Sequence, residues 1–254
     1  MSGNKSNRGI GAADKVLDII EAISSGNRQL ADIADQVGLA KSTTYEYLTT
    51  LQQRGMVVQQ EDGYRIGLKF LDHGAKAKQS YQELLDAAEP GLDRLVESTG
   101  EAVNLVVEEQ GLGVYIDRRT GKKGVPTDSW TGKHKHLHII SAGKAILAHL
   151  PDPRVDSILD QHGLKKITEH TITTPSVLHQ QVETIRDQGY AINDQESHSR
   201  IRAVGVPIIP NETVIGAISV AGPVGRLDSE RLTGDLLQQV QGVVNEIELK
   251  MTLS

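Results

Sequence analysis

The stretch LADIADQVGLAKSTTYEYLTTLQQRGMVVQQEDGYRIG, residues 30–67, decides the fold of the first part of the chain. It opens with apolar residues at i, i+3, i+4 and i+7, which predict a short amphipathic helix that ends at Gly38. A second helix is predicted over residues 41–53, and two short strands over residues 56–60 and 64–67 flank a turn. Helix, glycine turn, helix and hairpin in this order are typical of a winged helix-turn-helix.

The second helix is the predicted DNA-reading element. Its apolar stripe faces inward, so its outward face carries hydrogen-bonding side chains and one tyrosine near the N-terminus. Free backbone N–H groups and the positive end of the helix dipole favour phosphate there, and recognition helices meet base edges with these turns. An amphipathic helical hairpin that contacts another protein is the alternative interpretation. The predicted DNA-binding residues, the last of them in the hairpin, are Lys41, Ser42, Thr43, Tyr45, Thr49 and Arg65.

The length and composition exclude several classes of protein. At 254 residues the chain is long enough for two domains of ordinary size. It contains no cysteine, which excludes disulfides and thiolate zinc sites and indicates a reducing compartment, so we expect a cytoplasmic protein. The polar start MSGNKSNRGIG lacks the apolar segment of a signal peptide, and no stretch is apolar enough to cross a bilayer. We therefore expect no membrane partner.

Charge is distributed unevenly along the chain. The net charge is −6, yet residues 1–80 hold ten basic and nine acidic side chains, against 17 and 24 in the remainder. A nearly neutral DNA-binding part makes few phosphate contacts per subunit and depends on dimerisation, while an acidic remainder is repelled by DNA. With one phenylalanine, one tryptophan and six tyrosines, the chain is a poor stacking platform for single strands.

The pattern of elements divides the chain into three parts. Residues 1–67 form the predicted winged helix, residues 68–80 a linker helix, and residues 81–254 a second domain. In that domain a long helical pattern, which Pro90 interrupts and is expected to kink unless it lies in a first turn, precedes short strands, and a further helix closes the chain from Asp228. Strands between long helices predict an α+β fold in which helices cover one face of an antiparallel sheet.

Four further stretches complete a family resemblance. They are AAEPGLDRLVESTGEAVNL (87–105), LHIISAGKAILAHL (137–150), DQESHSRIRAVGVPI (194–208) and VIGAISVAGP (214–223). In this order and after residues 30–67, they resemble the IclR family of prokaryotic transcription regulators almost from end to end. The resemblance implies that residues 81–254 form a GAF-like α/β domain for effector binding and oligomerisation. It also implies a homodimer or homotetramer, an inverted-repeat operator in double-stranded DNA, and control of a catabolic operon by a small organic effector.

Three positions depart from the family pattern. Ala40 stands where a side-chain oxygen caps the recognition helix best, so Ser42 is expected to take over the capping. Glu46 stands where family members often carry arginine, and a carboxylate near phosphate lowers affinity. Ala221 replaces a small hydroxyl residue, which removes one hydrogen bond to an effector.

The resemblance also implies a set of effector-binding residues. Small side chains at residues 141–143 open a predicted helix and leave backbone N–H groups for an anion, although a tight helix start without ligand is the alternative. Asp194 and Glu196 share one face if their segment is extended, with Arg200 or Arg202 to pair them; a solvated acidic loop is the alternative. The full set is Ser141, Ala142, Gly143, Asp194, Glu196, Ala203, Val204 and Ser219.

Two other features of the second domain allow a role beside the effector site. Trp130 lies in a polar loop that either covers the pocket or packs on its own. His134, His136 and His138 recur at every second residue of a strand predicted over residues 133–140, which places them on one face. A metal-responsive regulator that senses through these histidines is the alternative function, and a polar strand face with one buried histidine is the structural alternative.

Enzymatic activity is the third interpretation, and the sequence argues against it. The chain has neither a GxSxG nucleophile elbow nor an HExxH zinc motif. The segment SAGKA lacks the upstream glycine and the trailing hydroxyl residue of a P-loop. We therefore expect no catalytic residues, no resident metal and no cofactor.

Overall fold

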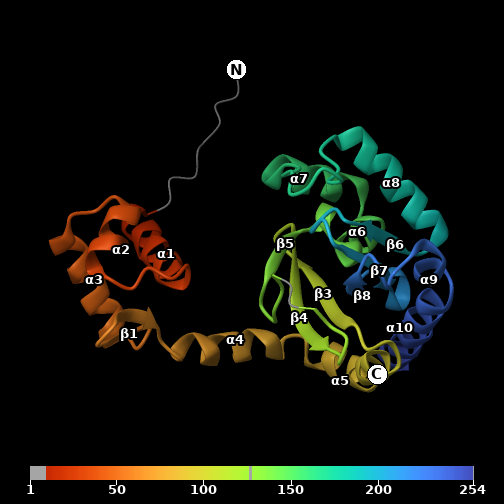
Figure 1. Ribbon diagram of the computed structural model, residues 1–254, viewed down its shortest axis with the longest axis horizontal. Coiled ribbons are helices and arrows are strands. Elements are labelled where there is room, and N and C mark those ends of the chain that lie inside the picture. Colours follow the sequence, from red (N-terminus) through yellow and green to blue (C-terminus); the bar gives the residue numbers. More distant parts are fainter. Residues whose placement is uncertain (1–9, 126–127, 254) are drawn as a thin grey trace. The chain divides into compact units, whose positions relative to one another are not determined.

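The computed structural model describes residues 10–125 and 128–253. The chain divides into two compact units, residues 1–80 and 81–254 (Figure 1). In the described part of the chain, no helix is both long and apolar enough to span a bilayer. The elements of the first unit are α1 (Gly11–Ser24), α2 (Leu30–Val37), α3 (Lys41–Gln53), β1 (Val57–Gln60), β2 (Gly63–Ile66) and α4 (Lys69–Gln79).

The first unit is built around one apolar cluster. Ile19 of α1, Ile33 of α2 and Leu48 of α3 are fully buried at its centre. Val57 and Tyr64 of the hairpin close the same cluster, so helices and wing share one core. Because each helix buries only one stripe, its other face is left for solvent or a partner.

The wing is fixed to the segment between α1 and α2. The hairpin pairs Gln60 with Gly63, so its tip is the two-residue turn Glu61-Asp62. Arg28 forms an ion pair with Asp62, and the backbone N–H of Tyr64 donates to the carbonyl of Arg28 at 2.7 Å. Only glycine fits at Gly63, because a Cβ there would lie 2.2 Å from that carbonyl oxygen. These contacts fix the tip against the body of the unit.

The second unit contains a six-stranded antiparallel sheet in the order β5-β4-β3-β8-β7-β6. Its strands are β3 (Ala102–Glu109), β4 (Leu112–Thr120), β5 (His134–His136), β6 (Ala191–Asp194), β7 (Ile201–Ile208) and β8 (Gly216–Pro223). Its helices are α5 (Gln82–Thr99), α6 (Ser141–Leu147), α7 (Asp152–His162), α8 (Pro175–Gln188), α9 (Ser229–Thr233) and α10 (Asp235–Leu253), with 3-10 turns η1 (Leu137–Ile139) and η2 (Pro210–Glu212).

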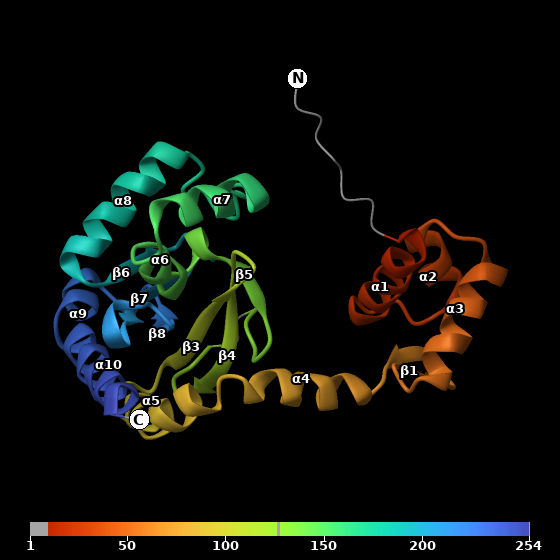
Figure 2. The same ribbon diagram turned by 180° about the vertical axis from the view of Figure 1, so that it is seen from behind.

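Helices cover both faces of this sheet, which corrects the expectation of one covered face. Helices α5 and α10 pack on one side with β3, β7 and β8, and α6, α7 and α8 form a second cluster on the other side (Figure 2). The apolar runs of the strands explain the difference, since strands buried on both faces lose the alternation of a half-exposed sheet. The α+β class with an N-terminal winged helix is confirmed.

Three local expectations about the second unit also change. The helix that contains Pro90 continues unbroken to Thr99, and the closing helix is divided into α9 and α10 at Gly234. The strand predicted over residues 133–140 ends at His136, where a 3-10 turn replaces it. The turn is needed because α6 begins at once and Gly143 packs on the backbone of Leu137.

Candidate functional site

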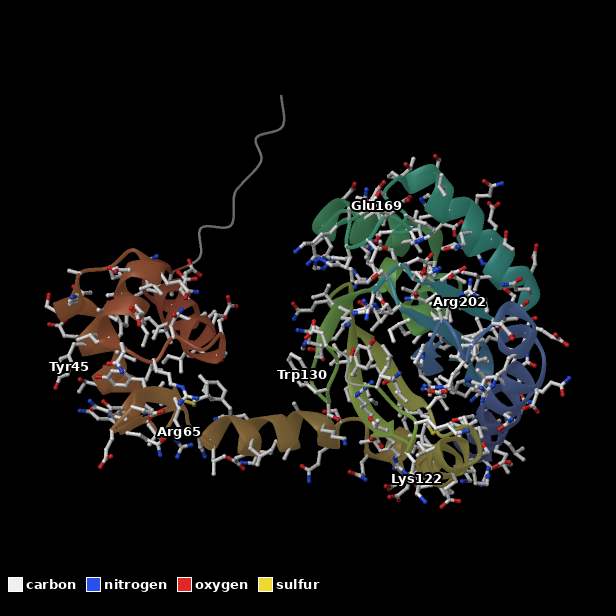
Figure 3. All side chains as sticks on the ribbon, in the orientation of Figure 1. Tyr45, Arg65, Lys122, Trp130, Glu169 and Arg202 are labelled. Carbon is white, nitrogen blue, oxygen red and sulfur yellow. The ribbon has the colours of Figure 1, made fainter. Side chains whose placement is uncertain are left out.

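The outward face of α3 carries the predicted DNA-binding residues. Lys41, Ser42 and Tyr45 are exposed, Tyr45 by 53%, whereas Thr44 on the inward side is fully buried. Arg65 on β2 is exposed as well, and both Tyr45 and Arg65 lie on the outside of the unit (Figure 3). The first turns of α3 and the wing therefore present polar and cationic side chains to solvent.

Two of the predicted DNA contacts are partly engaged within the protein. Thr43 and Thr49 are half-buried, and the Thr49 hydroxyl donates to the carbonyl of Tyr45 at 2.8 Å. The cap expected from Ser42 is not formed in the described structure, because α3 begins after Ala40 without any side-chain cap. Its first backbone N–H groups are consequently available to a ligand such as phosphate.

The second unit contains a cavity of about 90 Å³ on the α6 side of the sheet. Its floor is a hydrogen-bonded polar row across three strands, set by the strand register. Arg118 on β4 donates to Asn104 Oδ1 at 2.9 Å, and Asn104 Nδ2 donates to Ser219 Oγ at 3.2 Å. The lining residues are Asn104, Tyr115, Arg118, Asp128, Ser129, Lys135, Ile140, Ser141, Asn193, Ser197, His198, Ile201, Ala203, Ser219 and Ala221.

The small residues at the start of α6 divide between the cavity and the core. Ser141 lines the cavity, while Ala142 is buried in the apolar cluster on that side. A Cβ at Gly205 would lie 2.5 Å from the Ser141 carbonyl carbon, and one at Gly143 would lie 2.3 Å from the Leu137 oxygen. Small side chains at this point let α6 lie directly on β7. This close packing corresponds to the tight helix start that is the alternative interpretation of residues 141–143.

Asp194 and Glu196 point in different directions, because Gln195 between them has a positive φ of 65°. Asp194 forms a two-point ion pair with Arg202 at 2.7 and 3.1 Å, and this hydrogen bonding lowers the pKa of Asp194. Glu196 turns inward, where it accepts from the fully buried Lys144 Nζ at 2.6 Å. Neither carboxylate belongs to the cavity lining.

The buried pair Lys144–Glu196 is a structural clamp beside the cavity. Burial raises the pKa of Glu196 and lowers that of Lys144, while the attraction between the two charges opposes both shifts. Thr171 Oγ1 also donates to the Glu196 carbonyl at 2.8 Å. The clamp thus fixes the loop that carries Ser197 and His198 into the lining.

Of the predicted effector residues, the cavity brings together Ser141, Ala203 and Ser219. Val204 faces the other side of the sheet, in the cluster with α5 and α10. Sequence reasoning missed Asn104, Tyr115, Arg118, Lys135 and Asn193. The signal for Asn104 was present, since a polar residue within the apolar strand AVNLVV has the same need of a partner as Ser219.

Trp130 and the three histidines at 134, 136 and 138 do not belong to the cavity lining. Trp130 is 54% exposed, and the Lys133 ammonium lies 4.2 Å from its ring centre. Figure 3 labels the Trp130 side chain at the edge of the second unit. His134 is exposed, whereas His138 is buried in the 3-10 turn and its Nε2 lies 3.2 Å from the Lys165 carbonyl. The three histidines therefore do not share a strand face. Among the described residues, no three His, Cys, Asp or Glu side chains gather into a metal site.

Comparisons with known proteins agree with this arrangement. The IclR helix-turn-helix domain matches residues 12–61, and the C-terminal domain of the bacterial transcriptional regulator IclR matches residues 77–249. The chain is 32% identical to the probable HTH-type transcriptional regulator ArcR of Halobacterium salinarum, over 98% of this chain and 97% of that protein. It is 33% identical to the transcriptional repressor IclR of Escherichia coli, over 86% and 81% respectively.

A solved structure shows the same fold over the whole length. The crystal structure of IclR from Thermotoga maritima has a TM-score of 0.77 and 29% identity, and the match covers 96% of this chain and 100% of that one. The relatives are transcriptional regulators and not enzymes. The chain therefore belongs to the IclR family of DNA-binding transcriptional regulators.

Proposed function

We propose that the protein reads an inverted repeat in double-stranded DNA with α3 and the wing, and that a small organic effector in the cavity controls this binding. The observation that carries the proposal is the division of α3 into two faces. Leu48 is fully buried on the inner face, while Lys41 and Tyr45 are exposed on the outer one. A helix held in this way presents its first turns to the major groove.

Exposed apolar side chains support a homodimer. Helix α4 buries none of its residues, and Leu68 and Leu71 are 75% and 69% exposed. Leu17 on α1 is 58% exposed. Leu68 and Leu71, three positions apart at the start of α4, offer apolar side chains that a partner can cover, and a second copy of the chain provides the second recognition helix that an inverted repeat requires.

The cavity supports control by an effector. Its lining combines a hydrogen-bonded polar floor with the apolar side chains Ile140 and Ile201, which is the composition of a small-molecule site. A ligand that binds one arrangement of the subunits better shifts the population toward it and changes the spacing of the two recognition helices. The family resemblance implies control of a catabolic operon, and this completes the proposed role.

A selection experiment tests the DNA-binding part. The full-length protein is offered a random duplex library at moderate salt, and the selected sequences are compared with random duplex by fluorescence anisotropy. We expect an inverted repeat bound at least about 10³-fold more tightly than random DNA. Enrichment of no repeat, or equal affinity for both, would contradict the proposal. Tyr45→Ala, with an unchanged fold, is expected to weaken the preference.

A further inference from the structure

A carboxylate stands in the middle of the outward face of α3, that of Glu46. Glu46 follows Ser42 by four residues and precedes Gln53 by seven, so these three exposed side chains form one line along the helix. Opposite this line lie the buried residues of α3, which are Thr44, Leu48 and Leu51. On the basis of the proposed function, we propose that Glu46 selects cytosine at one base pair of each half-site and excludes guanine and thymine there.

The Glu46 carboxylate is open to a partner outside the protein. Three aspartates of the same unit are paired with lysine or arginine, namely Asp18, Asp62 and Asp72. Among the described residues, the Glu46 carboxylate forms neither an ion pair nor a hydrogen bond. The backbone carbonyl of Glu46 accepts from the Thr50 hydroxyl at 3.0 Å, and this contact does not involve the carboxylate. Both carboxylate oxygens are therefore available to the groove of a duplex.

The neighbouring hydroxyl groups are less restrictive readers. The hydroxyls of Thr49 and Thr50 donate to the backbone carbonyls of Tyr45 and Glu46 at 2.8 and 3.0 Å, so their hydrogens are used within the helix. The Ser42 hydroxyl either donates or accepts, and it suits any base edge. A carboxylate accepts hydrogen bonds and donates none. Whatever Glu46 meets in the groove must consequently be a donor.

The bases differ in what they offer a carboxylate at the major-groove edge. Cytosine presents the N4 amine, which donates, whereas guanine presents the acceptors N7 and O6 and thymine the acceptor O4. Adenine presents a donor at N6 beside an acceptor at N7, so it satisfies a carboxylate less well than cytosine does. Attraction to cytosine and repulsion from guanine and thymine act together to set the preference.

The symmetry of an inverted repeat makes this preference visible twice. Each subunit places one α3 in its own half-site, so the two Glu46 side chains meet base pairs related by the two-fold axis. We therefore expect one cytosine in each half-site, at symmetric positions.

Selection from a random duplex library tests the assignment with three full-length proteins, the wild type, Glu46→Gln and Glu46→Arg. For the wild type, replacing both symmetric cytosines by guanine is expected to weaken binding by at least about tenfold in fluorescence anisotropy. Glutamine keeps an acceptor and gains a donor, so Glu46→Gln is expected to bind the wild-type site at least as tightly and to lose discrimination at these two positions. Glu46→Arg is expected to prefer guanine there, because arginine bonds to both O6 and N7.

Glu61→Gln is the matched control. It makes the same chemical change at an exposed carboxylate of the hairpin turn, away from α3. We expect it to raise the affinity for all duplexes alike and to keep the preference for cytosine. Thermal unfolding of the three variants shows whether each one keeps the fold.

The outcomes separate the role of Glu46 from the proposed function. A wild-type site without symmetric cytosines overturns the role of Glu46, as does full discrimination by Glu46→Gln or its loss in Glu61→Gln. If the wild type selects an inverted repeat and the Glu46 variants read every position as it does, the regulator stands and only Glu46 is wrongly assigned. If the wild type selects no repeat, the proposed function fails and the role of Glu46 fails with it.

Discussion

The two faces of the six-stranded sheet are made by the same strands, but on the side of α6 a polar row interrupts the apolar packing. Toward α5 and α10, β3 contributes Val103, Leu105 and Val107 to a large apolar cluster. Toward α6, the neighbouring positions on β3 and β8 are Asn104 and Ser219, which bond to each other at the floor of the cavity. The first face stabilises the fold by apolar burial. The second face buries less apolar surface, because small residues let α6 pack closely on β7 and polar side chains line the cavity.

The largest expected effect comes from the buried ion pair on the polar side. Lys144→Met leaves Glu196 buried without its cation, so we expect a loss of about 3–5 kcal/mol in the free energy of unfolding, measured in urea. Because burial raises the pKa of Glu196, protonation relieves the variant at low pH, and the loss is smaller at pH 5 than at pH 8. A double variant with Glu196→Leu as well is expected to recover most of the stability. An equal loss in both variants would show that charge is not the cause.

A pair of substitutions on adjacent strands compares the two faces directly. Leu105 is fully buried, so Leu105→Ala is expected to cost about 3 kcal/mol in the free energy of unfolding. Ser219→Ala removes one hydrogen bond at a cavity where a water molecule can replace it, and about 1 kcal/mol is expected. Thermal unfolding of both variants measures the difference. A similar loss of unfolding free energy in Leu105→Ala and Ser219→Ala would show that the two faces do not differ in their contribution to stability.

His138 makes the cavity side sensitive to pH. Burial lowers the pKa of His138 from 6.5 to about 4, so folding favours the neutral ring. The neutral His138 ring contributes its whole share to the free energy of unfolding above about pH 6.5. This share, up to about 3 kcal/mol, is lost as the pH falls from about 6.5 toward 4. His138→Gln is expected to flatten the dependence of unfolding free energy on pH in this range. His134→Gln, in the same segment but exposed, is the control and keeps the wild-type profile.

Substitutions on the surface of the first unit are expected to change the free energy of unfolding least. Lys41→Ala and Tyr45→Ala are each expected to weaken operator binding by about 1–2 kcal/mol and to change the free energy of unfolding by less than about 0.5 kcal/mol. Lys41→Ala also lowers the slope of affinity against salt by about 1 if it contacts phosphate. Glu46→Gln removes an exposed carboxylate from the same helix and is expected to bind more tightly. Anisotropy at several salt concentrations measures all three.

The winged helix was largely predictable from local sequence. The bounds of α2 and α3 follow from apolar spacing and from Gly38, whose φ of 65° ends α2. The hairpin is equally local, because its two strands are separated only by a turn. The short strand and 3-10 turn after residue 133 were harder, since their shape depends on the contact between Gly143 and Leu137.

The cavity was predictable only in part, because strand register places distant residues together. Asn104 and Ser219 bond across 115 positions of sequence, and no local pattern reveals that neighbour. The positive φ of Gln195 turns the chain so that Glu196 points into the core. The prediction that Asp194 and Glu196 share one face assumed an extended segment and could not include this turn. The family resemblance supplied Ser219, and the need of a buried polar side chain for a partner applies equally to Ser219 and to Asn104.

The central claim is that the polar face of the sheet controls the DNA-reading unit. The most direct test is the affinity of the full-length protein for its selected operator, with and without small organic acids, in the wild type and in Arg118→Gln. The account predicts that at least one acid changes the wild-type affinity by about tenfold or more, the 1.4 kcal/mol expected of a coupled site. It also predicts that the variant binds the operator normally and does not respond. The same response in both proteins would contradict the account.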